Sequence, residues 1–282
     1  MIMDYLIIDF SNITSQILHS IPPLELKDDD YALFKYKLVN TLTRYVQKFK
    51  GRTIFALEGG DNWRKKIYSG YKADRANKRA KSGIDFEDYY KMLDDFTKNL
   101  KKIMYKAKFI KVPCAEADDI IGVLVKHLNS NVTVISTDSD FYQLYKYPGY
   151  HQYNPRTNTL IEVTNSTNFL LAKVLKGDKS DNIPNVRPKI GVKTANAIVE
   201  HADLNSWLKK EGLTERFDLN YKLISFDAIP KEIEDKIINE YNSYKHEKAN
   251  IMSYLMATGL TNILSEIPNL TNVIEFDNME LK

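Results

Sequence analysis

The chain has 282 residues and a net charge of +3, and 43% of its residues are hydrophobic. This share is enough for a folded core and excludes an intrinsically disordered protein. The single cysteine, Cys114, excludes a disulfide framework, and no apolar run approaches the roughly 20 residues of a membrane span. We therefore expect a cytoplasmic monomer that contacts no membrane.

Strands and helices alternate through the first part of the chain, a pattern that predicts an α/β fold with a mostly parallel central sheet. Short apolar runs rich in β-branched residues predict buried strands at 5–10, 53–57, 109–112 and 132–136. Apolar residues at helical spacing predict helices at 31–50, 85–106 and 116–128. Turn residues around Pro155 separate two β-prone runs, so we expect a hairpin over 150–163.

Beyond residue 166 the strand signals fade and helical patterns dominate. Helices are predicted at 168–176, 191–201, 231–244 and 248–258. We place a boundary near residue 180, which divides the chain into an α/β core (1–180) and a helical second part (181–282).

Acidic residues recur where the predicted strands end. They are Asp9, Glu58, the group Glu116, Asp118 and Asp119, the pair Asp138 and Asp140, and Asp178 and Asp181 in the next segment. Ligands of open α/β sheets bind beyond the carboxyl ends of the strands, so these acids are expected to meet at one edge. Each acid taken by itself could instead be a helix cap or a turn residue.

Clustered carboxylates raise one another's pKa and need a neutralising cation. Oxygen ligands without zinc-type cysteine–histidine spacing select Mg²⁺, with Mn²⁺ as a substitute. Two such ions can activate water and stabilise the leaving oxygen of a phosphodiester. The acids therefore predict a two-ion site for phosphodiester hydrolysis.

A basic strip runs from residue 64 to residue 81. Eight lysines and arginines and one acid give it a charge of +7, so the rest of the chain carries −4. Such a strip is typical of a face that binds phosphates, although a solvated helix face would have the same composition.

Four short motifs appear in a fixed order: Ile8-Asp9, EADD at 116–119, STDSD at 136–140 and GDKSDN at 177–182. With them the sequence resembles the flap endonuclease and 5′→3′ exonuclease family over nearly the whole chain. The resemblance implies a PIN-like 5′ nuclease core, with Asp9, Glu116, Asp118 and Asp138 around one ion and Asp140, Asp178 and Asp181 around the other. Asp119 would be a further ligand or a residue that supports the ligands. The family's acid at the end of the second strand would be Glu58, which we favour over Asp61.

The resemblance also implies a helical arch around residues 64–100. Lys72 and Arg75 at its base would face the scissile phosphate, and Tyr71 could stack on a terminal base. The remaining basic residues expected along this passage are Arg64, Lys78, Arg79 and Lys81. Residues 185–198 resemble a helix-turn-helix element for duplex DNA, in which Gly191, Lys193 and Thr194 would contact phosphates.

The function implied is that of a Mg²⁺-dependent 5′→3′ exonuclease and flap endonuclease with ribonuclease H activity. Its substrates would be DNA and RNA–DNA hybrids with 5′ ends, flaps or nicks. A single-strand-binding protein or a sliding clamp would be a further partner. Two alternatives stay open: a processive exonuclease on duplex ends, and a branched-DNA binding protein with a degenerate site.

Overall fold

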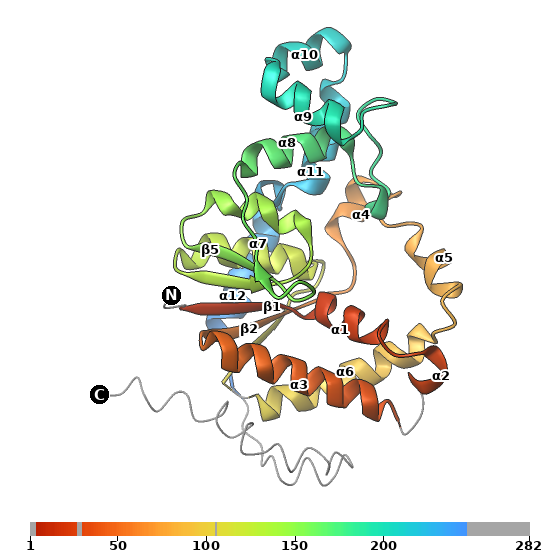
Figure 1. The fold of residues 1–282 in the computed structure, drawn as a ribbon, viewed down its shortest axis with the longest axis vertical. Helices are drawn as coiled ribbons and strands as arrows, with labels where there is room; N and C mark the ends of the chain where they lie inside the picture. Colours follow the sequence, from red (N-terminus) through yellow and green to blue (C-terminus); the bar gives the residue numbers. More distant parts are fainter. Residues whose placement is uncertain (1–3, 27–29, 105, 247–282) are drawn as a thin grey trace.

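The structure is a computed structural model that describes residues 4–26, 30–104 and 106–246. Its centre is a six-stranded sheet with the strand order β3-β2-β1-β4-β5-β6 (Figure 1). Strands β1 (Tyr5–Asp9), β2 (Arg52–Leu57), β3 (Lys108–Lys111), β4 (Val132–Ile135) and β5 (Tyr150–Asn154) are parallel. Strand β6 (Thr159–Leu160) pairs antiparallel with β5 and closes the predicted hairpin. The predicted α/β fold with a mostly parallel sheet is confirmed.

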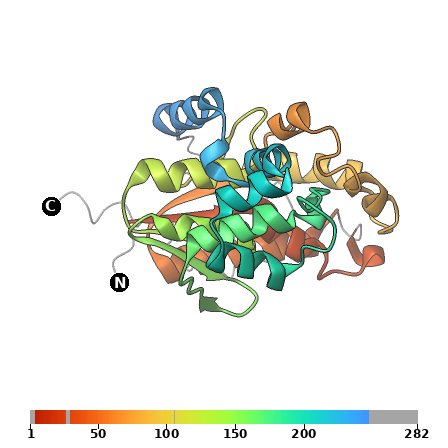
Figure 2. The same cartoon turned by 90° about the horizontal axis from the view of Figure 1, so that it is seen from above.

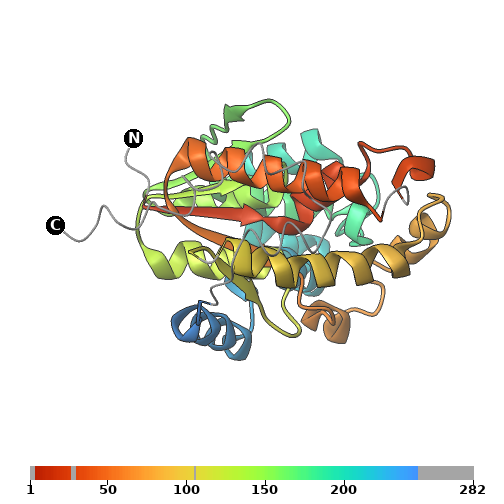
Figure 3. The same cartoon turned by 90° about the horizontal axis from the view of Figure 1, so that it is seen from below.

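Helices cover both faces of the sheet, which explains why its inner strands are apolar on both sides. On one face, Leu6 and Ile8 pack against α1 (Phe10–Leu18), α3 (Ala32–Phe49) and α6 (Phe86–Ile103). On the other, Ile7 and Ile54 pack against α7 (Ala117–Leu128) and α12 (Lys231–Ser243). Figure 3 shows α3 and α6 side by side across the lower face of the sheet.

A third apolar cluster lies outside the two faces of the sheet. It joins α8 (Ser166–Lys176), α9 (Val192–His201), α10 (Leu204–Glu211) and α11 (Thr214–Ile224) into a separate helical layer. This layer stands above the sheet in Figure 1 and covers part of it when seen from above in Figure 2. Helix α8 thus packs with later helices, whereas α12 returns to the sheet. The predicted boundary near residue 180 falls inside this continuous packing.

The segment predicted to form the arch lies beyond the carboxyl ends of the strands (Figure 1). It contains α4 (Trp63–Ile67), α5 (Arg75–Ala80) and the start of α6, whereas the rest of α6 up to residue 100 packs against the sheet. The remaining short helices are α2 (Pro23–Leu26) and the 3₁₀ turns η1 (Ser139–Lys146), η2 (Lys179–Asp181) and η3 (Phe226–Ala228).

Most of the predicted elements are present, with ends shifted by a few residues. Helices α1, α10 and α11 were not predicted. The predicted helix at 248–258 lies outside the described residues. Within the described ranges, the helices are too short or too polar to cross a membrane.

Candidate active site

The acidic residues predicted at the strand ends do gather at one edge of the sheet. Asp9 is the last residue of β1 and the N-cap of α1, where its Oδ1 accepts the backbone N–H of Asn12 at 3.0 Å. Its other oxygen accepts the Ser136 hydroxyl at 2.8 Å, and Ser136 directly follows the neighbouring strand β4. The central two strands therefore end in one hydrogen-bonded unit.

Asp9, Asp118 and Asp138 form a group of carboxylates that oppose one another's ionisation. Burial raises the pKa of Asp9 to about 6. Burial, and then the charges of Asp138 and Asp9, raise the pKa of Asp118 well above its usual range. Burial also raises the pKa of Asp138, although Lys173 partly opposes this. Among the described residues, none of the three forms an ion pair with a lysine or arginine.

Glu58 directly follows β2 and Asp61 lies three residues farther along the loop, and both side chains are exposed. The protein atoms around the Glu58 carboxyl group exclude water from it and so raise its pKa. The negative charges of Glu116 and Asp9 raise the pKa further. Much of the Glu58 side chain is exposed, so solvent weakens this effect. The choice of Glu58 over Asp61 as the second-strand acid stays a prediction, based on its position directly after β2.

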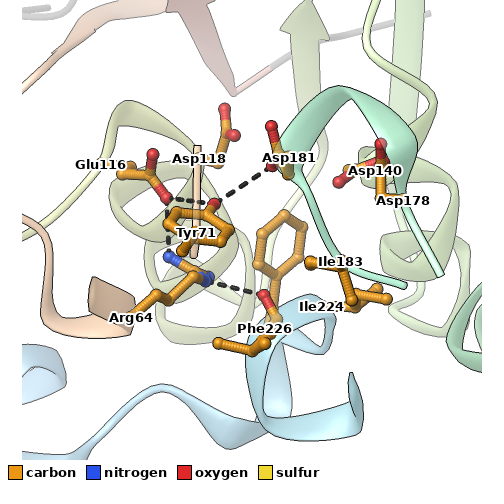
Figure 4. A pocket seen from close by; sticks show the side chains of 11 residues that line it. Arg64, Tyr71, Glu116, Asp118, Asp140, Asp178, Asp181, Ile183, Ile224 and Phe226 are labelled. Atoms are coloured by element: carbon orange, nitrogen blue, oxygen red, sulfur yellow. Dashed lines mark hydrogen bonds and ion pairs between the residues drawn. The ribbon is translucent and has the colours of Figure 1, made fainter. Parts of the chain in front are cut away.

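Glu116 is the N-cap of α7 and receives three donors from the arch segment. Its Oε2 accepts Arg64 Nη1 at 2.9 Å and the Tyr71 hydroxyl at 2.8 Å (Figure 4). Its Oε1 pairs with Lys72. Burial opposes ionisation of Glu116, but Lys72 and Arg64 outweigh it and hold its pKa at about 2. The carboxylate is therefore fully ionised and already neutralised by protein cations.

Asp119 and Arg64 form a buried ion pair beneath Glu116. The guanidinium Nη2 lies 2.7 Å from Asp119 Oδ1, and the two side chains are 3% and 0% exposed. Asp119 Oδ2 accepts the Trp63 indole N–H at 3.0 Å and the backbone N–H of Glu116 at 3.0 Å. Arg64 also donates from Nε to the Leu223 carbonyl of α11 at 2.8 Å.

This placement does not fit two of the predicted roles. Arg64 is too deeply buried to line a nucleic-acid passage, because its fork of donors is used inside the protein. Asp119 instead suits the supporting role expected for it, because both its oxygens are bonded to Arg64, Trp63 and the α7 backbone and hold Glu116 in place. Tyr71 is 3% exposed, which leaves its ring unavailable for base stacking in this arrangement.

The base of the arch is fastened to the loop around Asp181. Arg75 Nη2 lies 2.9 Å from Asp181 Oδ1, and Lys72 Nζ lies 3.6 Å from Asp181 Oδ2. The Lys72 backbone N–H donates to the Asp181 carbonyl at 2.9 Å. Lys72 itself has a left-handed backbone (φ 55°), a strained conformation that the surroundings must hold. The two predicted phosphate-binding cations thus sit on carboxylates of the site.

Asp140 and Asp178 share one cation that the sequence analysis did not single out. Lys173, on the buried side of α8, pairs with Asp140 Oδ1 and lies 2.9 Å from Asp178 Oδ2. Burial opposes ionisation of Asp178, but Lys173 and the Ser180 hydroxyl outweigh it and hold its pKa well below its usual value. The only signal in the sequence is a lysine among the apolar residues of α8.

The carboxylates at the strand ends are the donor set for the divalent ions that the fold family implies. Its chemistry fits, because oxygen donors from several strand ends meet and three of them resist ionising together. The carboxylates are, however, too far apart to hold an ion as they stand: within the described ranges, no three acidic, histidine or cysteine side chains converge enough to do so.

The remaining predicted nucleic-acid residues lie on the surface. Lys78, Arg79 and Lys81 are exposed on and after α5, and Gly191, Lys193 and Thr194 are exposed where α9 begins. Helices α8 and α9 pack together across the intervening loop. A pair of packed helices is thus present at 166–201, and its role as a helix-turn-helix element stays a prediction.

Comparison with known families decides the assignment. The sequence model of the 5′-3′ exonuclease N-terminal resolvase-like domain matches residues 4–171, more than half of the chain. The chain belongs to this family. A second model, of the C-terminal part of T4 RNase H, matches residues 188–270. The resemblance to the flap endonuclease and 5′→3′ exonuclease family, stated from the motifs, is therefore confirmed.

Individual relatives agree with this assignment. Ribonuclease H of Enterobacteria phage T4 is 29% identical, over 93% of this chain and 94% of its own length. A 5′-3′ exonuclease of Buchnera aphidicola is 30% identical, but the match covers only 57% of each chain. The bacteriophage T5 D15 flap endonuclease, solved with DNA and metal ions, shares the fold. It has a TM-score of 0.66 and 20% identity, over 84% of this chain and 97% of its own.

Proposed function

We propose that this 5′-3′ exonuclease is a divalent-metal-dependent nuclease that hydrolyses phosphodiesters near the 5′ end of a strand beside a duplex. The observation that carries the proposal is the edge of the sheet, where Asp9, Glu58, Asp118 and Asp138 meet Lys72 and Arg75 from the base of the arch. A nuclease needs both signs of charge at one point: acids that hold ions, and cations that neutralise phosphate.

The proposed cofactor is Mg²⁺, with two ions per chain and with Mn²⁺ as a substitute. Bound ions would supply Lewis acidity toward the phosphodiester and the attacking water. Asp9, Glu116, Asp118 and Asp138, with Glu58, would hold one ion. Asp140, Asp178 and Asp181 would hold the other.

In this proposal the cationic side chains Lys72 and Arg75 also bind the phosphate of the substrate. Lys72 and Arg75 now neutralise Glu116 and Asp181. If those carboxylates held ions, Lys72 and Arg75 would be free to contact a phosphate at the same place. Arg75 is 45% exposed and Lys72 is 10% exposed, so Arg75 is the more accessible of the two. Both contribute charge where negative charge develops during hydrolysis.

The proposed substrates are DNA and RNA–DNA hybrids with 5′ ends, flaps or nicks. The similarity to a phage ribonuclease H over nearly the full length of both chains supports the removal of RNA primers and adjacent DNA during phage replication. That setting would place the protein in the host cytoplasm. A single-strand-binding protein or a sliding clamp as partner, and a monomeric state, remain part of the proposal.

Cleavage assays with three labelled substrates test this function: a 5′ flap, a nicked RNA–DNA hybrid and a blunt duplex, each with Mg²⁺ and with a chelator. Asp138→Asn should lower turnover by several orders of magnitude and leave DNA binding intact, because it removes a ligand charge and conserves shape. Normal turnover by this variant would refute the assignment. Retained binding by the wild type without cleavage, with any divalent ion, would instead indicate a binding protein.

A further inference from the structure

Lys173 is the most deeply buried lysine of the site, and its position calls for an explanation. Its side chain is 9% exposed and comes from α8, whose neighbouring residues Leu170 and Val174 pack in the helical layer. The ammonium reaches Asp140 in η1 and lies 2.9 Å from Asp178 Oδ2, at the start of η2. Three separate elements thus converge on one positive charge.

The two carboxylates that Lys173 joins are those proposed to hold the second ion. Asp181, the third proposed ligand of that ion, is paired with Arg75. The carboxylates Asp9, Asp118 and Asp138 of the first position have no such ion pair among the described residues. The two proposed metal positions therefore differ: protein cations pair with every carboxylate of the second, whereas at the first they pair with Glu116 alone.

We propose that Lys173 is a tethered cation that occupies the second metal position, and that a divalent ion must displace its ammonium to bind there. This inference rests on the proposed two-ion site. A buried ammonium between two carboxylates is held by charge and geometry, and its displacement leaves it needing another partner or water. The second ion should therefore bind more weakly than the first, and Lys173 should set the difference between them.

Calorimetric titration of the full-length protein with Mn²⁺, without nucleic acid, tests the inference. Wild-type protein should show one stronger and one weaker site, with bound Mn²⁺ counted independently by electron paramagnetic resonance. Lys173→Met should raise the affinity of the weaker site by at least about tenfold, because the competing charge is gone. Lys173→Arg keeps the charge and should retain the wild-type difference between the sites.

Lys179→Met is the matched control, since Lys179 is an exposed residue next to Asp178. It should change the weaker affinity by less than about fivefold, because exposed charges contribute little. If Lys173→Met does not fold without metal, Lys173→Gln, which keeps a hydrogen-bond donor, takes its place. An unchanged weaker affinity in the uncharged variants would overturn this inference and leave the proposed nuclease intact. Absence of Mn²⁺ binding in every protein would refute both.

Discussion

The buried charged residues of this site are stabilised by neighbouring side chains of opposite charge. Glu116 is ionised because Lys72 and Arg64 face it, and Arg64 is tolerated inside the protein because Asp119 and Glu116 pair with it. Buried ion pairs of this kind contribute little net stability when complete. Removal of one partner is costly, however, since it leaves the other charge uncompensated.

Arg64→Met should therefore destabilise the fold by about 3–5 kcal/mol, because Asp119 is left as an unpaired buried carboxylate. Urea unfolding followed by circular dichroism measures this change. Lys78→Met, at an exposed position in the same basic strip, should shift the free energy of unfolding by no more than about 0.5 kcal/mol. A small effect of Arg64→Met would mean that Arg64 is not buried in solution, and it would revive its predicted role in DNA binding.

A second pair of residues distinguishes the two candidate acids after β2. Glu58→Gln should lower kcat by at least roughly tenfold, as is typical of groups that support a metal site. Asp61→Asn should leave kcat unchanged, because Asp61 lies three residues beyond Glu58 and away from the end of β2. The assay is flap cleavage at saturating Mg²⁺. The reverse order of effects would transfer the ligand role to Asp61.

At the scale of elements, the close approach of two loops brings the acids of the site together. Gly59 follows Glu58, and its backbone N–H donates to the Ala115 carbonyl at 3.0 Å, just before Glu116. A Cβ atom at Gly59 would lie 1.7 Å from the Val112 carbonyl oxygen and 2.7 Å from that of Ala115. Only glycine permits the end of β2 to touch the β3–α7 loop in this way.

Gly59→Ala should consequently destabilise the protein by roughly 1–3 kcal/mol, the usual cost of overpacking, and lower activity with it. Gly191→Ala is the matched comparison, because a Cβ there meets no atom within 4 Å and its φ of −92° suits any residue. Thermal unfolding should be unaffected by Gly191→Ala. Weaker duplex binding by this stable variant would then support a phosphate contact at Gly191. Equal melting temperatures for both variants would contradict the close approach.

The elements also differ in how well the sequence predicts them. Strands β1 to β4 and helices α3 and α7 were predicted because each is a continuous apolar run or a regular helical stripe. Helix α1 was missed because it begins at Phe10, directly after the last residue of β1, with no loop to separate the two. Helices α10 and α11 are short and polar, and they depend on contacts with α8 and α9 that the local sequence does not reveal.

The same limit applies to the candidate site. Its acids were predictable, because topology brings strand ends to one edge whatever the loops do. The pairing of Lys173 with Asp140 and Asp178, and of Arg64 with Asp119, was not. The contacts of Lys173 with Asp140 and of Arg64 with Asp119 join residues 33 and 55 positions apart. The sequence alone does not show whether a basic side chain faces solvent or a buried acid.

At the scale of the whole molecule, the net charge is small, but the basic and acidic residues are unevenly distributed over the surface. Exposed basic residues on α5 and at the start of α9 lie outside the carboxylate edge, so nucleic acid could be held by its backbone on either side of the site. Contacts to phosphates release counterions, and affinity then falls linearly with salt on logarithmic scales.

Replacement of Lys78, Arg79 and Lys81 together by alanine should reduce the slope of log Kd against log salt by about 0.9 for each phosphate that is no longer neutralised. Fluorescence anisotropy with a flap substrate and Ca²⁺ measures this slope. Replacement of three basic residues outside the arch segment, Lys35, Lys37 and Lys48 of α3, should leave it unchanged. An unaltered slope in the α5 variant would exclude these residues from the phosphate-binding face.

Helix α12 has a consequence for the order in which the molecule can be built. Its buried residues Ile233 and Ile237 complete the apolar layer over α7 on the same face of the sheet as β1 residue Ile7. On the ribosome, therefore, only α7 covers this face after all six strands have emerged, until nearly 80 further residues have followed β6. The sheet that carries the acids is among the first parts synthesised, and it would be among the last to reach its finished packing.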